Sequence, residues 1–281
     1  MLGRCRRRVV VCDTGTPRNR ASRALHGYLT RDGIAPLDLL QLGRQELRPY
    51  RVEYRRTRVE DVYRRSDRFE VQLARGPSLF CRKLLIATGV EENYPDIEGF
   101  RECYGTSVFH CPYCDGWERR DSRLAVYGGG PAGAALALSL KTWSRDVVLF
   151  SSDRRLSRAV RARLDKHGIR VIPQTVRRLR HTAGRLHAVE YASGDIRRDA
   201  LFFTTGQHQQ AVFAQSLGCE FTRKGTVRTD RLGETCVPGV FVVGDASFDV
   251  QFAIVAAAEG AKAAVAINRQ FQAEAGQALA S

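Results

Sequence analysis

Two cysteines separated by two residues and followed directly by an acid form the stretch with the clearest chemistry, Cys111-Pro112-Tyr113-Cys114-Asp115. Thiols at this spacing can close a disulfide ring and open it again, and the thiolate is the form that attacks during the exchange. At the N-terminus of a helix, the dipole and the free N–H groups would favour that thiolate. Asp115 is placed to take and return the proton of each exchange. The stretch therefore predicts a redox-active disulfide.

Two other interpretations of these cysteines stay open, an inert pair and a zinc site. Suitable zinc ligand atoms occur in Cys103, His110, Cys111 and Cys114. Structural zinc sites usually combine paired knuckles, and this sequence has no second C-x-x-C, so we expect no metal. The chain has eight cysteines, and we expect the others to be free thiols because a disulfide framework is typical of much shorter secreted chains.

Length and composition favour a globular enzyme. With 281 residues, 43% of them hydrophobic and 27% charged, the chain can form about two domains with buried cores. No apolar run approaches the roughly 20 residues of a membrane span. The Arg-rich N-terminus leads into a short Val9-Val10-Val11 run and not into the long apolar region of a signal peptide. We therefore expect a cytoplasmic protein that does not act at a membrane.

The formal net charge of +15 comes almost entirely from arginine. These arginines are spread over all segments, and no motif that reads RNA or DNA accompanies them. The charge therefore indicates a basic solvated surface and no nucleic-acid partner. A surface of this sign would also steer an acidic protein or an anionic cofactor towards the chain.

A glycine-rich loop follows the cysteines. The apolar run Leu124–Tyr127 predicts a strand, residues 134–143 predict a helix, and Gly128, Gly130 and Gly133 lie between them as G-x-G-x-x-G. In this context the glycines allow a tight turn and bring a pyrophosphate to the helix N-terminus, although a glycine turn without a ligand is the alternative. The next strand, 146–150, is followed by serines and then by Arg154 and Arg155, which favours NADPH over NADH.

Three other strand ends carry residues suited to a nucleotide. The apolar run before Asp13 predicts a strand that ends in an acid, which could bond ribose hydroxyls or could be a helix cap or a loop residue. Thr88 and Gly89 end a second predicted strand, 80–86, and Gly244-Asp245 ends a third. Small residues there let a backbone approach a ligand closely. A similar Thr-Gly ending at Gly206 suggests two related nucleotide domains.

Together these features, in this order, resemble the low-molecular-weight thioredoxin reductase family of the pyridine nucleotide-disulfide oxidoreductases, most closely the bacterial branch with a Cys-Pro-Tyr-Cys motif. The resemblance implies an α/β fold with two Rossmann-like, three-layer domains built on mostly parallel sheets. Residues 1–108 and 237–281 would form a discontinuous FAD domain, and residues 109–236 would form the NAD(P)H domain with the redox disulfide. Such enzymes are usually homodimers.

The resemblance also implies roles for single residues. Electrons would pass from NADPH, or NADH, through FAD to the disulfide and on to a thioredoxin-like protein or a low-molecular-weight disulfide. Cys114 would lie nearest the flavin, Cys111 would attack the partner, and Asp115 would be the acid-base group. Cofactor-binding residues would be Asp13, Asn19, Thr88, Gly89, Gly244, Asp245, Gln251, Phe252 and Ala253 for FAD, and Gly128, Gly130, Gly133, Arg154 and Arg155 for the nicotinamide nucleotide.

Two departures from the family pattern bear on activity. The strand and G-x-G-x-x-G loop that normally precede the Asp13 strand do not occur in this sequence, so we expect a gap in the FAD-domain sheet and weak FAD retention. The family's His-Arg-Arg run is replaced by Ser151-Ser152-Asp153-Arg154-Arg155. Two alternatives follow, an FAD-dependent dithiol oxidase that uses oxygen and a non-catalytic remnant that binds a nucleotide or a partner.

Overall fold

The computed structural model describes residues 1–152, 155–247 and 250–276. The chain forms two compact units. Unit 1 contains Met1–Arg18, Leu37–Glu91 and the segment that starts at Gln207, and unit 2 contains Asn19–Pro36 and Glu92–Gly206. The strands β7 (Val90–Glu92) and β16 (Gln207–Gln209) pair where the chain passes from one unit to the other.

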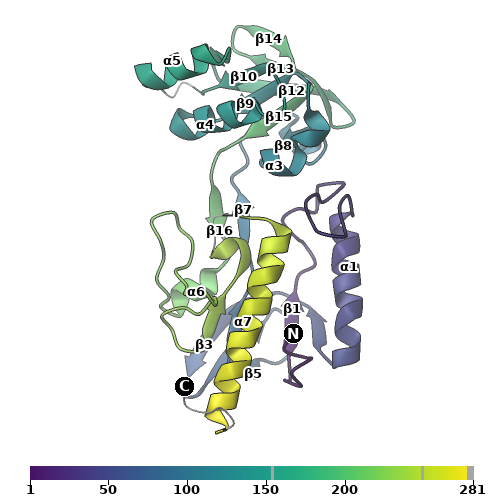
Figure 1. Ribbon diagram of the computed structural model, residues 1–281, viewed down its shortest axis with the longest axis vertical. Coiled ribbons are helices and arrows are strands. Elements are labelled where there is room, and N and C mark those ends of the chain that lie inside the picture. The colour runs from purple at the N-terminus through teal and green to yellow at the C-terminus, as the bar shows by residue number, and fades with distance from the viewer. Residues whose placement is uncertain (153–154, 248–249, 277–281) are drawn as a thin grey trace. The chain divides into compact units, whose positions relative to one another are not determined.

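Unit 2 is built on a five-stranded parallel sheet with the order β11-β10-β9-β15-β8 (Figure 1). Its central strands are apolar and buried at nearly every position, as expected for a parallel sheet covered on both faces. If β9, β10, β11 and β15 are numbered one to four in chain order, their order across the sheet is three-two-one-four. This is the strand order of a Rossmann half. The strands are β8 (Val108–Phe109), β9 (Leu124–Tyr127), β10 (Val147–Phe150), β11 (Arg170–Ile172) and β15 (Ala200–Phe203).

The two faces of this sheet carry different layers. On one face, α4 (Gly130–Leu140) and α5 (Arg158–Lys166) bury Ala137, Leu140 and Leu164 against β9 and β10. On the other face, an antiparallel sheet contributes Leu179 and Val189 to a second core. This sheet consists of β12 (Val176–Thr182), β13 (Arg185–Tyr191) and β14 (Gly194–Arg197). The short elements α2 (Phe100–Cys103), α3 (Pro112–Asp115) and η2 (Trp117–Arg119) complete the unit.

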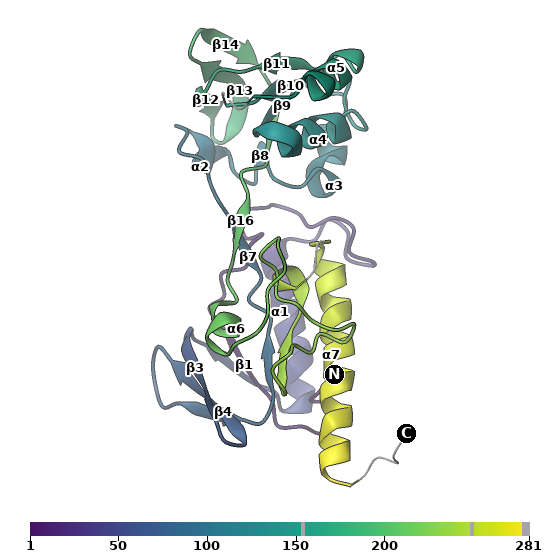
Figure 2. The same cartoon turned by 90° about the vertical axis from the view of Figure 1, so that its left-hand side faces the viewer.

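Unit 1 has two parallel strand pairs and an antiparallel sheet (Figure 2). In one pair β1 (Val10–Asp13) lies beside β2 (Glu53–Arg56), and in the other β6 (Leu84–Ile86) lies beside β17 (Val240–Val242). The antiparallel sheet consists of β3 (Val59–Arg65), β4 (Arg68–Leu73) and β5 (Leu79–Cys81). The helical elements of the unit are α1 (Pro36–Leu47), η1 (Arg48–Tyr50), α6 (Val212–Ser216), η3 (Gly244–Ala246) and α7 (Ala253–Glu274).

The two parallel pairs of unit 1 are separate sheets among the described residues. The strand that ends at Asp13, β1, pairs with β2, whereas β6 pairs with β17. Val10 in β1 is 40% exposed, whereas Val240 in β17 is fully buried in a hydrophobic cluster with Val242 and Ala246. The α/β class and the parallel sheets agree with the predicted fold.

The strands and helices differ from the sequence predictions in two places. Residues 80–86 form two strands and not one, because β5 pairs antiparallel with β4 while β6 pairs parallel with β17. Helix α4 begins at Gly130, earlier than predicted. Unit 2 ends at Gly206, and the following segment packs into the core of unit 1 through Ala211, Ala214, Cys219 and Val227.

No helix in the described part of the chain is long and apolar enough to cross a membrane.

Candidate functional site

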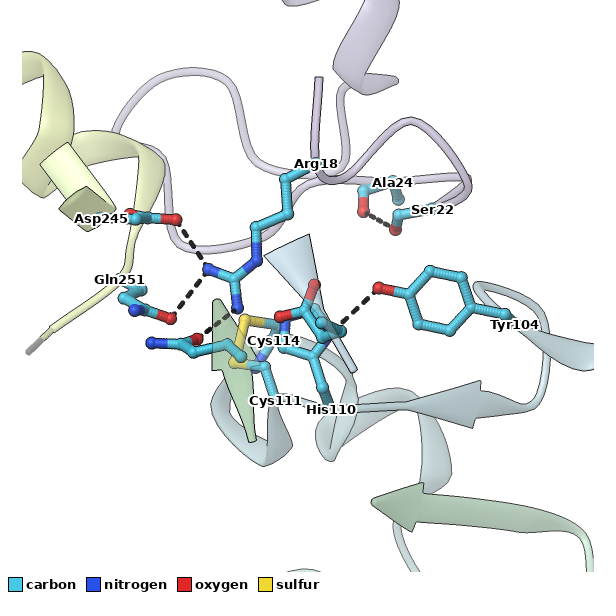
Figure 3. Close-up of a disulfide and its surroundings, with 11 residues drawn as sticks. Arg18, Ser22, Ala24, Tyr104, His110, Cys111, Cys114, Asp245 and Gln251 are labelled. Carbon is cyan, nitrogen blue, oxygen red and sulfur yellow. Dashed lines mark hydrogen bonds and ion pairs between the residues drawn. A yellow bond between two sulfur atoms is a disulfide. The ribbon is translucent and has the colours of Figure 1, made fainter. Parts of the chain in front are cut away.

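The predicted cysteine pair forms a disulfide between Cys111 and Cys114 (Figure 3). Cys111 is the N-cap of α3, and its sulfur accepts a hydrogen bond from the backbone N–H of Cys114 at 3.1 Å. Pro112 fits the first position of this helix because it lacks an N–H that would need a partner there. The backbone N–H of Cys114 at the helix start thus points at the sulfur of Cys111, and this hydrogen bond favours a thiolate when the disulfide opens.

The residues of the alternative zinc site have other partners. Cys111 and Cys114 are bonded to each other, and Cys103 is a fully buried thiol in the hydrophobic core. His110 lies against an aromatic cluster, with Nδ1 3.2 Å from the Tyr104 hydroxyl and Nε2 3.8 Å from Glu92. Within the described ranges no three His, Cys, Asp or Glu side chains lie together as a metal site would require. The other six cysteines are free thiols, as predicted.

Asp115 follows the disulfide directly and is only partly exposed to solvent. Burial, together with the nearby carboxylate of Glu118, raises the pKa of Asp115 from 3.8 to about 7, against the opposing charges of His26 and Arg119. A carboxyl group with this pKa is present in both protonation states at neutral pH. It can therefore donate a proton to a leaving thiolate and accept one from an attacking thiol. Asp115 also lines a cavity of about 530 Å³ within unit 2.

Two aromatic side chains beside the disulfide are exposed, and the sequence reasoning did not identify them. Tyr113 is 72% exposed and Trp117 is 65% exposed. The edge of the Tyr113 ring meets Trp143, and the Arg120 guanidinium lies 4.4 Å from the centre of the Trp117 ring. Large aromatic side chains are common in binding surfaces because they bring a large contact area at a low entropic cost. Their position within and just after the C-x-x-C motif is the feature of the sequence that could have identified them.

The predicted nicotinamide-binding loop connects β9 to α4. A Cβ on Gly128 would lie 2.6 Å from the Thr204 side chain, and one on Gly133 would overlap the backbone of Gly128. Gly130 has a φ of +62° and nothing within 4 Å of the position of a Cβ. The first and third glycines are thus required by packing, whereas the middle one faces open space at the helix N-terminus. This division of roles suits a loop that receives a pyrophosphate.

Replacing Gly133 by alanine tests this loop. We expect a loss of about 1–3 kcal/mol in stability from overpacking against Gly128, and a KM for the nicotinamide nucleotide raised about tenfold. Gly260→Ala is the matched control, since Gly260 lies in α7 with no atom near its Cβ position, and the gain in helix propensity should stabilise unit 1 by up to about 1 kcal/mol. Thermal unfolding and steady-state kinetics measure both effects. Equal changes in stability and in KM for Gly133→Ala and Gly260→Ala would contradict the assignment of this loop to the nicotinamide nucleotide.

Strand β10, the next strand of the sheet after this loop, is followed by polar residues, some of which are buried and some exposed. Ser151 is buried, and the Ser152 hydroxyl is buried with no hydrogen-bond partner in the described part of the chain. An unpaired buried hydroxyl at the carboxyl end of a Rossmann strand is suited to a ribose oxygen. Arg155 is exposed, and Arg154 lies outside the described residues.

In unit 1 the predicted FAD residues gather at the carboxyl ends of β6 and β17. Arg18, which the sequence reasoning missed, donates to the Asp245 carboxylate at 2.6 Å and to Gln251 at 2.8 Å (Figure 3). A Cβ added to Gly89 would meet only Asp245, at 4.0 Å, and Gly244 also has a positive φ. Thr88 is exposed, and Phe252 and Ala253 begin α7. Open backbone beside a paired acid, amide and guanidinium fits a group that carries hydroxyls and phosphates.

Asp13 ends β1 as predicted and already has three hydrogen bonds. Its carboxylate accepts from the Tyr54 hydroxyl at 2.7 Å, from Arg44 at 3.0 Å and from the backbone N–H of Gly15 at 2.8 Å. Burial alone would raise the pKa of Asp13, but these donors outweigh it and hold the pKa below 3.8. The ionised carboxylate is therefore available as an acceptor for ribose hydroxyls. Asn19, also predicted to bind FAD, belongs to unit 2.

Comparison with known proteins agrees with the predicted family. Residues 2–260 match the family model of pyridine nucleotide-disulphide oxidoreductases. A protein described as a probable thioredoxin reductase, from Arthroderma benhamiae, is 28% identical over 99% of this chain and 78% of its own length. The crystal structure of HlmI superposes with a TM-score of 0.94 at 40% identity, covering 97% of this chain and 87% of that one. A putative thioredoxin reductase TrxB from Bacillus anthracis superposes at 0.93 with 33% identity, covering 97% and 93%.

The family match extends over most of the chain, and the structural similarity includes both units. The chain therefore belongs to the pyridine nucleotide-disulphide oxidoreductase family.

Proposed function

We propose that this protein is a thioredoxin-reductase-like flavoprotein that passes electrons from NAD(P)H through FAD to the Cys111–Cys114 disulfide and then to a substrate disulfide. The observation that carries the proposal is a closed disulfide at a helix start, followed by an acid with a pKa of about 7. The thioredoxin reductases among the relatives support a thioredoxin-like protein or a small disulfide as the acceptor. The proposal includes a homodimer in the cytoplasm.

The dithiol half of the reaction needs only the residues of unit 2. In the reduced state the Cys111 thiolate attacks a sulfur of the substrate disulfide, and the departing sulfur takes a proton from Asp115. The Cys114 thiol then gives up its proton and attacks Cys111, which breaks the mixed disulfide. The second substrate thiol leaves, and the Cys111–Cys114 bond forms again. Two electrons have moved from the protein dithiol to the substrate, and Asp115 has handled the protons.

The two cofactors would be held by residues that fit them in each unit. Asp13, Asp245, Gln251 and Arg18 would hold FAD, and the loop from Gly128 to Gly133 would hold the nicotinamide nucleotide. When bound, FAD accepts a hydride from the nicotinamide and returns the electrons to a disulfide. Arg18 pairs with Asp245 and Gln251 and would hold both beside the ligand, and the open space at Gly89 would let backbone and ligand approach each other.

Tyr113 and Trp117 would form the contact surface for the substrate. Replacing Trp117 by alanine removes an exposed aromatic side chain beside the disulfide without disturbing the core. We expect the KM for the substrate disulfide to rise about 5- to 30-fold, since truncating a side chain that anchors a partner costs about 1–2 kcal/mol, while kcat changes little. Phe80→Ala, on strand β5 of unit 1, is a control of similar exposure at 60%, and an equal change in both variants would contradict the assignment.

Rapid mixing of the purified protein with NADPH tests the proposal as a whole. Fast loss of the oxidised flavin absorbance, followed by its return on addition of a disulfide, supports the reductase. Loss of absorbance only with dithiols, and its return with oxygen, would instead favour the dithiol oxidase. The flavin content of the purified protein is measured first, because protein that contains no flavin and takes up none from added FAD would favour the non-catalytic remnant.

A further inference from the structure

The cavity beside Asp115 has charged walls and lies entirely within unit 2. Its lining residues come from several segments of the chain, namely 22–26, 105–109, 115–119, 185–187 and Asp199. At about 530 Å³ it is large enough for several water molecules next to Asp115. A carboxyl group that changes its protonation state in each catalytic cycle needs such a connection to solvent, because burial separates it from bulk water.

His26 lines this cavity between two acids. Its Nε2 lies 3.5 Å from Glu118, and its Nδ1 lies 3.3 Å from Asp32. Asp32 in turn accepts a hydrogen bond from the backbone N–H of Gly27 at 2.8 Å, which fixes its carboxylate beside the imidazole. The exposed fraction of the side chains rises from 26% for His26 to 38% for Glu118 and 71% for Asp32. His26 and Glu118 line the same cavity as the partly buried Asp115, and Asp32 on the other side of His26 is exposed to solvent.

We propose that His26, held between Glu118 and Asp32, is the group through which Asp115 exchanges its proton with solvent. When Asp115 has donated its proton to a departing thiolate, protonated His26 returns one to it across the waters of the cavity, and His26 is protonated again from bulk solvent on the side of Asp32. In the opposite direction Asp115 passes a thiol proton outwards along the same route. No electrons move in these steps, and each proton is given up by one base and taken by the next.

The other charged groups around the cavity do not serve this purpose. Arg23, Arg119 and Arg185 carry guanidinium groups, a chemical type that does not pass protons on in proteins. Arg119 also donates to the carbonyl of Thr106 at 2.6 Å. His187 lies 2.9 Å from the hydroxyl of Thr182, and Asp199 accepts from Arg123. His26 is thus the imidazole in this lining that lies between carboxylates, and an imidazole ring can take a proton at one nitrogen and give one up at the other.

This inference rests on the proposed function of the disulfide, but its test requires neither NADPH nor the natural substrate. The holoprotein is reduced with dithiothreitol, desalted and mixed with dithiobis(nitrobenzoate), and the release of the coloured thiolate is followed. Because this leaving group needs no proton, the assay follows the outward direction, in which Asp115 takes a thiol proton and passes it to solvent. Cys5 and Cys236 are first replaced by serine, because both thiols are exposed and would also react. If NADPH fails to reduce the protein, the proposed function fails, while this exchange between the dithiol and the reagent can still be measured.

In this background we expect His26→Ala to slow the exchange about tenfold at pH 7, below the ~10²–10⁴ that a positioned acid or base contributes, because cavity waters remain. Added imidazole should restore the rate by entering the space left by the side chain. His26→Gln, which keeps an amide near Glu118 but carries no titratable proton, should be equally slow. His187→Ala, in the same cavity, should react like the parent protein.

Three results would overturn the inference. The first is a His26→Ala variant as fast as the parent at pH 7. The second is a slow variant that imidazole does not restore, since that would indicate a purely structural role. The third is a His26→Gln variant with the parental rate, because the amide can replace the hydrogen bonds of His26 but not its proton transfer.

Discussion

Replacing Cys114 by serine should abolish turnover and leave the protein covalently attached to its substrate. Cys111 can still attack a disulfide, but the mixed disulfide has no neighbouring thiol to resolve it. We expect kcat to fall by about 10³-fold or more, as when a nucleophile is removed from an enzyme. With Cys5 and Cys236 also replaced by serine, intact-mass spectrometry after incubation with the disulfide should show one adduct per chain, on Cys111.

The reciprocal variant, Cys111→Ser, should be as inactive as Cys114→Ser but should form far less adduct if Cys111 is the attacking thiol. Cys236→Ser serves as the control, since this thiol is exposed on unit 1 and should not affect turnover. Equal trapping by the two inactive variants would mean that the roles of the two sulfurs are not distinct. Trapping only by Cys111→Ser would reverse the assignment that the family resemblance implies.

Replacing Asp115 by asparagine should slow disulfide exchange by about 10²–10⁴-fold, the range for a general acid-base group. Asparagine keeps the shape of the side chain but cannot give or take a proton. The parent protein should show an inflection near pH 7 in its rate profile, because the pKa of Asp115 is raised to about 7, and the variant should lack it. Stopped-flow measurements between pH 5 and pH 9 decide this, and a retained inflection would assign it to another group.

The same substitution should change stability in a pH-dependent way. The folded protein holds the Asp115 proton up to about pH 7, whereas the unfolded chain releases it near the usual value of 3.8. Between these values the folded state binds more protons, so this group makes the protein less stable as pH rises. Asp115→Asn removes that loss and should be more stable than the parent at pH 8, by about 1–3 kcal/mol after allowance for partial exposure, but not at pH 4. Urea denaturation of the oxidised proteins measures the difference.

The sequence was sufficient for the parts of the fold that repeat a local pattern. The run Leu124–Tyr127 is apolar at every position, and a strand covered on both faces requires this. The glycines after it are required locally, because a side chain at Gly133 would overlap Gly128. Cys111, Cys114 and Asp115 are adjacent in the chain, so their proximity did not depend on tertiary structure. Chemistry that depends on residues adjacent in the sequence can therefore be predicted without knowledge of the fold.

The features that the sequence did not reveal depend on long-range packing. Arg18 reaches Asp245 across more than two hundred residues, and His26 meets Glu118 only after the chain folds. The raised pKa of Asp115 depends on burial, which has no signature in the residues around it. The segment after Gly206 contains few long apolar runs, and its small buried residues, such as Ala211 and Ala214, were recognisable as core only in the structure.

The strand pairing in unit 1 has a consequence for the order of folding. Leu84 in β6 pairs with Val240 in β17, so this contact closes a loop that contains most of unit 2. All five strands of the unit 2 sheet, in contrast, come from residues 108–203. As the chain leaves the ribosome, the sheet that supports the disulfide can form before the partner strand of β6 has been made. Closure of unit 1 should therefore be the late and slow step, since contacts between distant parts of a chain form slowly.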